Sequence, residues 1–232
     1  MLNDGDPAEH QQTPPNGAPW RHAAQVGLPD GSGVYLGKRF ILTANHVAHI
    51  DAGRLNGRHW KRDTRFKPKR IGGEDLKLIR IAGDPGLPRL PLIGPRENVL
   101  SRRCTVIGWG LGAGASLAER GWRWGDIRTK RWGLNTTLPK LVERPDGLRV
   151  ATVFDRDARE TSLANADSGC GLFIRFSGVW KLAAIGIDVD DQNDTFFDRD
   201  PAAPGHQPTR SYYIPLREWR TAIDAIIDGA AP

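Results

Sequence analysis

Short apolar runs separated by glycine and proline characterise this chain and predict an all-β fold. Its 27 glycines and 17 prolines supply the turns that many short strands need. Residues 33–43 predict a hairpin of two β-rich runs around Gly37-Lys38, and residues 172–187 predict another around Ser177-Gly178. Single strands are predicted over residues 76–81, 104–109, 148–154 and 211–214.

The period of the apolar residues changes near the end of the chain. From residue 216 onward they recur with the spacing of one helix face instead of alternating. The residues with this spacing are Leu216, Trp219, Ile223, Ile226 and Ile227. We therefore expect a C-terminal α-helix packed against the β-structure.

A proline-rich stretch divides the chain. Residues 83–98 contain four prolines and predict a linker on the outside of the molecule. We place a domain boundary there, with one unit at residues 20–95 and a second at residues 96–232. Residues 1–19 are polar and lack apolar periodicity, so we expect a flexible N-terminal segment.

The sequence Asp167-Ser168-Gly169 has the form of a turn that presents a nucleophilic hydroxyl. The glycine lets the backbone turn sharply, and such a turn can aim N–H groups at one point, as an oxyanion requires. By itself the tripeptide is weak evidence, because Asp, Ser and Gly also fill ordinary turns. Its weight depends on whether the chain also supplies a base.

His46 and Asp75 are the candidates for that base and for the residue that orients it. His46 follows the predicted hairpin, and Asp75 opens the strand at residues 76–81. A serine hydroxyl needs a base such as imidazole, and the imidazole needs a carboxylate to fix its tautomer. The order His46, Asp75, Ser168 is that of chymotrypsin-type enzymes and not of subtilisins or α/β-hydrolases.

Four motifs in this order resemble those of the trypsin-like serine peptidases. Residues 43–46 are similar to their Thr-Ala-Ala-His motif, and residues 75–78 to their Asp-Ile/Leu-x-Leu segment. Residues 104–110 resemble the Cys-x-x-x-Gly-Trp-Gly strand, and residues 166–171 resemble Gly-Asp-Ser-Gly-Gly-Pro. The resemblance implies two six-stranded antiparallel β-barrels of the chymotrypsin type, followed by the C-terminal helix.

The resemblance also implies a bacterial secreted serine endopeptidase that acts on protein or peptide substrates. Ser168 would be the nucleophile, His46 the base and Asp75 its orienting carboxylate, with the backbone N–H groups of Ala166 and Ser168 as the oxyanion hole. The family has glycine where Ala166 stands, and glycine tolerates conformations that alanine resists. A peptidase-like binding protein without turnover is therefore kept as an alternative.

The sequence leaves the substrate preference open. By the same resemblance, Ser162 occupies the base of the specificity pocket and Asp188 lies near its wall. A neutral base suits apolar or mixed substrate side chains, whereas Asp188 would favour cationic ones. Asp167 matches a carboxylate that in trypsin pairs with a freed N-terminus, and an arginine or local hydrogen bonds are alternatives for its partner here.

The chain has two cysteines, Cys104 and Cys170. In the resembled family a disulfide links the strand before Gly-Trp-Gly to the strand after the nucleophile. Cys104 stands where the first partner is expected, but Cys170 comes only two residues after Ser168, earlier than the usual second partner. A disulfide between them and two buried thiols are equally open.

The formal net charge of +6 raises the question of a polyanionic partner. Basic residues gather at residues 54–70 and again at residues 120–132, where they alternate with tryptophans. Such segments can bind a nucleic-acid strand, but a solvated loop and arginines lying over tryptophan rings account for the same pattern. We therefore do not expect nucleic acid as a partner, and keep polyanion binding as the lesser alternative.

No cofactor and no metal are expected, because serine-type acyl transfer uses side chains and backbone alone. Residues 188–206 are acidic, but their spacing matches no EF-hand calcium loop. No apolar run is long enough to span a membrane, and residues 1–19 lack the apolar centre of a signal peptide. Since the resembled peptidases are mostly secreted, we expect a secreted or periplasmic protein whose leader is absent from this sequence, with a cytoplasmic one as the alternative.

Overall fold

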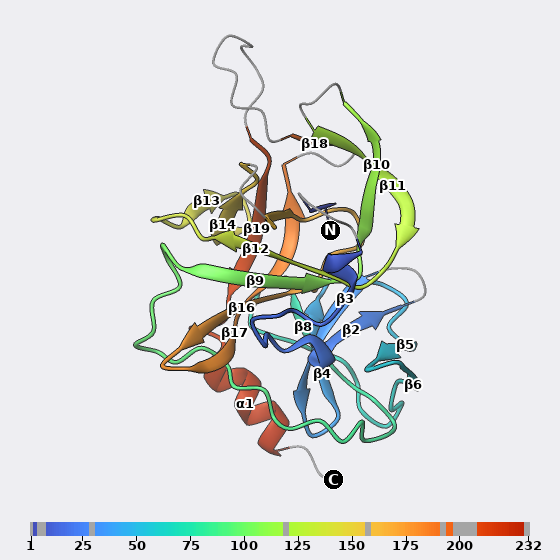
Figure 1. The fold of residues 1–232 in the computed structure, drawn as a ribbon. Coiled ribbons are helices and arrows are strands. Elements are labelled where there is room, and N and C mark those ends of the chain that lie inside the picture. Colours follow the sequence, from blue (N-terminus) through green and yellow to red (C-terminus); the bar gives the residue numbers. More distant parts are fainter. Residues whose placement is uncertain are drawn as a thin grey trace.

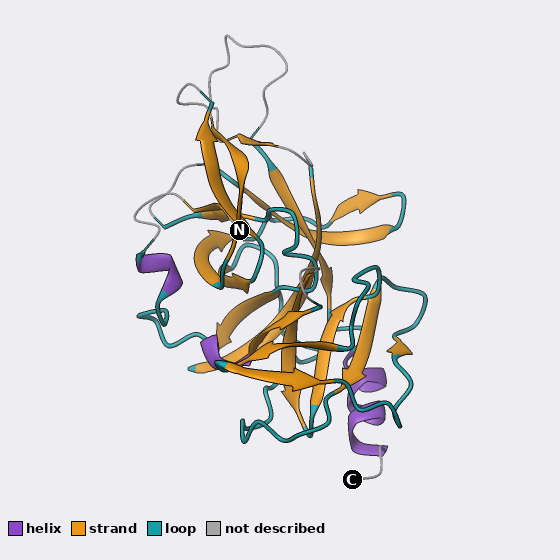
Figure 2. Cartoon of the chain, turned by 90° about the vertical axis from the view of Figure 1, so that its right-hand side faces the viewer, coloured by secondary structure: helices purple, strands orange, loops and turns teal. Residues whose placement is uncertain are grey.

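The computed structural model describes residues 2–3, 8–27, 31–117, 121–155, 159–190, 194–196 and 208–229. Strands dominate these residues, and one α-helix, α1 (Arg220–Gly229), stands near the C-terminus. The shorter purple segments in Figure 2 are 3₁₀ helices at Glu9–Gln11 and Trp20–His22. The prediction of an all-β fold with a C-terminal helix is confirmed.

The N-terminal half forms a seven-stranded antiparallel sheet, drawn in blue and cyan in the lower part of Figure 1. Its strand order is β6-β5-β2-β3-β4-β8-β7. The strands are β2 (Ala23–Val26), β3 (Gly31–Gly37), β4 (Phe40–Ala44), β5 (Ala52–Leu55), β6 (Arg58–Lys61), β7 (Lys69–Arg70) and β8 (Leu76–Arg80).

The C-terminal half forms a second antiparallel sheet of seven strands, in the order β12-β9-β16-β17-β19-β14-β13. Its strands are β9 (Arg103–Gly108), β12 (Arg131–Thr136), β13 (Val142–Arg144), β14 (Gly147–Val153), β16 (Gly171–Phe176), β17 (Val179–Val189) and β19 (Arg210–Pro215). A three-stranded sheet contains β10 (Leu111–Ser116), β11 (Gly121–Arg128) and β18 (Asp194–Phe196), and β1 (Leu2–Asn3) pairs with β15 (Thr161–Ser162).

The main sheet of each half has seven strands instead of the expected six. Among the described residues, the first and last strands of neither sheet are hydrogen-bonded to each other, so neither is a closed barrel. Isolated bridges between Arg62 and Ile81 and between Thr137 and Thr152 link the regions of β6 and β8 and of β12 and β14. The strands that lie outside these links are β7 and β13, of two and three residues. They are too short and too polar to give an alternating pattern in the sequence.

Both predicted hairpins are present. In the second, β16 and β17 join through Ser177 and Gly178, which have φ of 47° and 83°. In the first, the turn residues are Lys38 and Arg39, with φ of 46° and 70°, one position later than predicted. Positive φ at both central residues is the type I′ geometry that matches the twist of antiparallel strands.

Two apolar clusters form the core. One joins the two sheets, because it contains Leu42 from β4 together with Val106 from β9 and Phe173 from β16. The other lies on the opposite face of the N-terminal sheet and contains Ile41, the neighbour of Leu42. Since successive residues of β4 enter different clusters, both faces of that strand are buried, and its sequence is continuously apolar instead of alternating.

The N-terminal segment differs from its prediction, because residues 8–19 pack against the C-terminal sheet. The His10 side chain is fully buried, with Nδ1 2.8 Å from the carbonyl oxygen of Trp132. Asn16 Nδ2 donates to Thr105 Oγ1 (2.9 Å) and the indole of Trp180 donates to the Asn16 carbonyl (3.3 Å). These long-range polar contacts give no apolar period, which is why the sequence predicted flexibility. The predicted boundary at residue 95 stays a prediction.

Helix α1 packs its apolar face against the first core cluster. Ile223 and Ile227 are buried there, as the helical spacing predicts. On its outer face Asp228 accepts from Lys38 of the first hairpin (2.8 Å) and from Arg89 of the linker (2.7 Å). The helix therefore connects the linker and the N-terminal sheet to the C-terminal half.

Candidate active site

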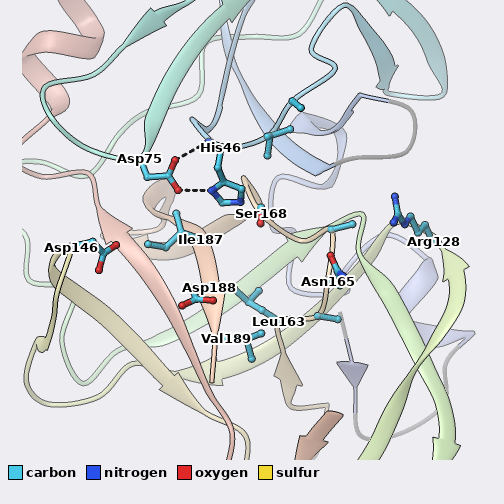
Figure 3. Close-up of a pocket in the computed structure, with 14 residues that line it drawn as sticks. His46, Asp75, Arg128, Asp146, Leu163, Asn165, Ser168, Ile187, Asp188 and Val189 are labelled. Carbon is cyan, nitrogen blue, oxygen red and sulfur yellow. Dashed lines mark hydrogen bonds and ion pairs between the residues drawn. The ribbon is translucent and has the colours of Figure 1, made fainter. Parts of the chain in front are cut away.

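The pairing of β4 with β8 brings His46 and Asp75 together. Ala44 pairs with Leu76, so His46 follows one strand and Asp75 precedes the other at the same end of the sheet. The backbone N–H of His46 donates to Asp75 Oδ1 (2.8 Å), and His46 Nδ1 lies 2.5 Å from Asp75 Oδ2 (Figure 3). With Nδ1 as the donor, Nε2 is left as the acceptor that a general base needs.

Asp75 is poised to remain ionised. Burial alone would raise the pKa of its carboxyl group, but hydrogen bonds and charge from His46 and backbone donation from Asn45 outweigh burial and hold the pKa below its usual value of 3.8. A carboxylate in this state accepts the Nδ1 proton and stabilises the imidazolium that forms when Nε2 takes a proton.

Lys77 fixes the loop that carries His46. Its ammonium group donates to the carbonyl oxygens of Asn45 (2.9 Å) and Val47 (2.5 Å), the residues on either side of the histidine. Burial lowers the pKa of Lys77, and the charge of Asp75 opposes that shift. No motif in the sequence indicated this role, because it depends on how β8 pairs with β4.

Ser168 is the second residue of the second of two consecutive turns. They span residues 164–167 and 167–170 and are closed by N–H···O hydrogen bonds of 3.1 Å and 2.7 Å. In each turn only the third residue has positive φ, 67° at Ala166 and 90° at Gly169, which is the type II geometry.

Gly169 cannot be replaced by a residue with a side chain. A Cβ at this position would lie 2.0 Å from the carbonyl oxygen of Ser32 in β3. The N–H of Ser32 in turn donates to the carbonyl of Ser168 (2.8 Å). The turn that presents the candidate nucleophile is therefore attached to the N-terminal sheet, which also carries His46 and Asp75.

The three predicted catalytic residues line one cavity of about 620 Å³. Figure 3 shows the His46 ring between the Asp75 carboxylate and Ser168. Ser168 is half-buried and the His46 side chain is 49% exposed, so a substrate can reach both. The structure thus brings Ser168 together with two residues that lie more than ninety positions before it in the sequence.

The orientation of two peptide groups determines where the N–H groups of Ala166 and Ser168 point. In a trans peptide the C=O and N–H point in opposite directions. The carbonyl of Asn165 accepts from the N–H of Leu111 (3.0 Å), so the N–H of Ala166 points to the other side, where Asn165 and Ala166 line the cavity. The carbonyl of Asp167 is bound in the second turn, so the Ser168 N–H also points away from that turn. An oxyanion hole needs such paired donors.

Ala166 adopts a backbone conformation with positive φ, which glycine tolerates better than alanine. Its φ of 67° is left-handed, which costs an alanine roughly 1 kcal/mol more than a glycine.

We expect Ala166→Gly to raise the free energy of unfolding by up to about 1 kcal/mol, because relief of strain exceeds the added freedom of the unfolded chain. Ala166→Val should lower it by more than about 1 kcal/mol, because a β-branched residue resists positive φ. Urea unfolding measures both, and a glycine variant destabilised by more than about 1 kcal/mol would contradict the assigned backbone.

Asp167 is held by local hydrogen bonds. Its carboxylate accepts the N–H groups of Gly110 (2.7 Å) and Ala164 (3.0 Å). A Cβ at Gly110 would lie 2.3 Å from the Asp167 carboxyl carbon, which explains the second glycine of the Gly-Trp-Gly motif. Arg131 lies close by. Burial lowers its pKa, the Asp167 charge opposes that shift, and Nη1 donates to the Gly110 carbonyl (3.2 Å).

The two predicted pocket residues have different positions. Ser162 is fully buried and is not among the residues that line the cavity, so its role as the pocket base stays a prediction. Its hydroxyl lies 3.4 Å from that of Ser211 in β19, and the next residue, Leu163, lines the cavity. Asp188 does line the cavity, but Arg144 Nη2 lies 2.5 Å from its Oδ2. No local pattern indicates this pair, because its members are 44 residues apart.

The cysteines are two free, buried thiols, so a disulfide between Cys104 and Cys170 is excluded in this structure. Cys170 faces Gly108, where a Cβ would lie 2.8 Å from the Cys170 Cβ. Gly108 is four strand residues from Cys104, about 13 Å along β9, well beyond disulfide range. Burial raises the pKa of Cys104 to about 12, and burial with the Asp167 charge raises that of Cys170, so both thiols stay protonated.

Several basic and aromatic residues of 121–132 pack against other parts of the fold. Trp132 is fully buried, and the Trp122 ring contacts that of Phe154 at 6.0 Å. Lys130 lies 4.2 Å from the centre of the Trp20 ring. Aromatic rings packed in this way present little surface on which nucleic-acid bases could stack.

Within the described ranges no cluster of three or more His, Cys, Asp or Glu side chains is arranged to hold a metal ion. Most of the acidic stretch 188–206 lies outside those ranges. Of its described members, Asp190 accepts from the Tyr212 hydroxyl (2.5 Å) and from the Arg210 N–H (3.0 Å). Among all the residues that the structure describes, no helix is both long and apolar enough to cross a membrane.

Comparison with known proteins identifies the fold. No family model matches the sequence, and no curated protein does. Among solved structures the chain is similar to a mutant of human heparin binding protein (CAP37), with a TM-score of 0.62 and 16% identity. The match covers 96% of this chain and 97% of that one. With its two antiparallel sheets and C-terminal helix, the chain therefore has a chymotrypsin-type fold.

Proposed function

We propose that the protein is a serine endopeptidase. The observation that supports this most is the Asp75–His46 hydrogen-bonded pair, which faces the same cavity as Ser168. In a chymotrypsin-type fold these three residue types, in this chain order, suit acyl transfer to water.

The proposed reaction has two halves. Ser168 Oγ attacks the carbonyl carbon of a peptide bond while its proton passes to His46 Nε2, and the oxyanion accepts from the N–H groups of Ala166 and Ser168. The C–N bond then breaks as the imidazolium returns the proton to the leaving amine. In the second half water replaces the amine and attacks the acyl carbon while its proton passes to His46 Nε2. The ester C–O bond then breaks, the carboxylic acid leaves, and His46 returns the proton to Ser168 Oγ.

We propose that the enzyme prefers neutral, mainly aliphatic side chains next to the cleaved bond. Leu163 and Val189 in the cavity wall are nearly fully buried and apolar, and Ile187 adds a third aliphatic side chain. The charge of Asp188 is offset by Arg144, so it offers little attraction to a cationic substrate side chain.

Removal of the Arg144 charge that offsets Asp188 should shift this substrate preference. We expect Arg144→Gln to raise kcat/KM for substrates with Lys or Arg beside the cleaved bond by about fivefold relative to neutral ones, the equivalent of about 1 kcal/mol at a half-exposed site. Competition between matched peptides measures the ratio. The double variant Arg144→Gln/Asp188→Asn should restore the original ratio, and Arg175→Gln, a charge loss on β16 outside the cavity lining, should not change it. An unchanged ratio in Arg144→Gln would rule Asp188 out as a specificity residue.

Two binding roles are the alternatives. A peptidase-like protein without turnover would bind peptides in the same cavity. A polyanion binder would use exposed basic residues of 54–70, and the similar solved structure is that of a mutant human heparin binding protein. Replacement of Ser168 would leave either activity unchanged.

Digestion of a peptide mixture separates these roles. Mass spectrometry of the products should show new termini with the native chain and none with Ser168→Ala. Identical products from both proteins would refute the endopeptidase proposal.

A further inference from the structure

Ser32 joins the two halves of the molecule behind the candidate oxyanion hole. It lies in β3 and is fully buried. Its backbone N–H donates to the carbonyl of Ser168 (2.8 Å), and its carbonyl accepts from Thr43 Oγ1 (2.6 Å). These backbone contacts attach the nucleophile turn to β3 and β4 whatever the side chain at position 32.

The Ser32 hydroxyl makes two further hydrogen bonds. Its Oγ accepts from the backbone N–H of Trp109 (2.8 Å) and donates to the carbonyl of Ala166 (3.3 Å). The hydroxyl therefore connects β3, the end of β9 and the turn at residues 164–167, because its single oxygen both donates and accepts.

Ala166 needs such a restraint. Its positive φ is unfavourable for an alanine, and rotation to negative φ would turn its N–H out of the position that an oxyanion requires. The hydrogen bond from Ser32 Oγ holds the carbonyl of this residue, while Leu111 holds the carbonyl of the residue before it. The two contacts fix the peptide planes on both sides of the Ala166 Cα.

We propose that Ser32 is a positioning residue that keeps Ala166 in its left-handed conformation, and so keeps the Ala166 N–H aimed at the reacting oxygen. This inference rests on the proposed peptidase function. Ser32 would hold residue 166 at positive φ. A glycine at position 166 would not need this restraint, because glycine adopts positive φ without strain.

The test is a double-mutant cycle in the full chain. Ser32→Ala should lower kcat about tenfold with KM unchanged, because the N–H of Ala166 acts on the oxyanion of the transition state and not on the ground state. In an Ala166→Gly background the same replacement should change kcat less than about twofold. The coupling between the two positions is a readout that a merely structural serine would not produce.

Thr43→Val is the matched control. It removes a buried hydroxyl from the same hydrogen-bonded group, at the Ser32 carbonyl, without touching Ala166. We expect no coupling of Thr43→Val with Ala166→Gly. An unchanged kcat in Ser32→Ala, or the same loss in both backgrounds, would overturn the role of Ser32 in a protein that is still active. A native chain without hydrolysis would instead refute the proposed function, so the two failures can be distinguished.

Discussion

Replacement of Ser168 by alanine is expected to reduce kcat by about a millionfold. The Ser168 hydroxyl oxygen forms the ester bond of the acyl-enzyme. No other cavity-lining residue among those described offers a hydroxyl or thiol. The fold should survive, because the contact of this residue with β3 uses its backbone carbonyl. Steady-state hydrolysis of a peptide substrate, with circular dichroism to verify the fold, measures the effect.

Ser116→Ala is the control for this loss. Ser116 is an exposed serine at the end of β10, away from the cavity. It should leave kcat unchanged. If Ser168→Ala retained native turnover, hydrolysis by the native preparation would have to come from another residue or from a contaminant, and the assignment of the nucleophile would be wrong.

Asp75→Asn has the second largest expected effect, a loss of about 10⁴-fold in kcat. The asparagine can keep its place but would present an N–H to His46 Nδ1, which favours the tautomer with the proton on Nε2. That tautomer cannot take the proton from Ser168. The loss should appear in kcat much more than in KM, because the imidazolium forms only during the reaction. An Asp75→Asn variant within tenfold of native turnover would contradict the orienting role.

The same variant tests the electrostatic assignment through pH. The pKa of Asp75 is lower in the folded chain than its usual value of 3.8, so the folded state binds fewer protons in that range. The stabilisation is therefore present above pH 3.8 and is lost as pH falls through the lower folded pKa. Urea unfolding should find Asp75→Asn less stable than the native chain at neutral pH, and the difference should shrink under acid conditions below that value. A difference that grew with acidity would reverse the assigned shift.

The strands and the catalytic candidates were predictable because each leaves a local mark in the sequence. The Ser177-Gly178 turn and the helical spacing of Ile223 and Ile227 depend on residues within a few positions of one another. His46 and Asp75 each stand at the end of a predicted strand, so the pairing of two strands was enough to place them together.

Features that depend on contacts between distant segments were not predictable. Leu163 lines the cavity without a motif that indicates it, and Arg144 offsets the charge of Asp188 from another strand. The burial of His10 against Trp132 likewise has no local period. The distance between Cys104 and Cys170 follows from strand register, which the spacing of cysteines does not reveal.

The most direct test of the account is reaction of the native chain with a fluorophosphonate probe, followed by mapping of the modified residue by mass spectrometry. Such probes form a stable bond only with a serine whose hydroxyl is activated by a base and whose adduct is held by an oxyanion hole. One adduct, on Ser168, is expected in the native chain and none in His46→Ala. A folded native chain that takes up no probe, or takes it up equally without His46, would contradict the claim that these residues form a working catalytic site.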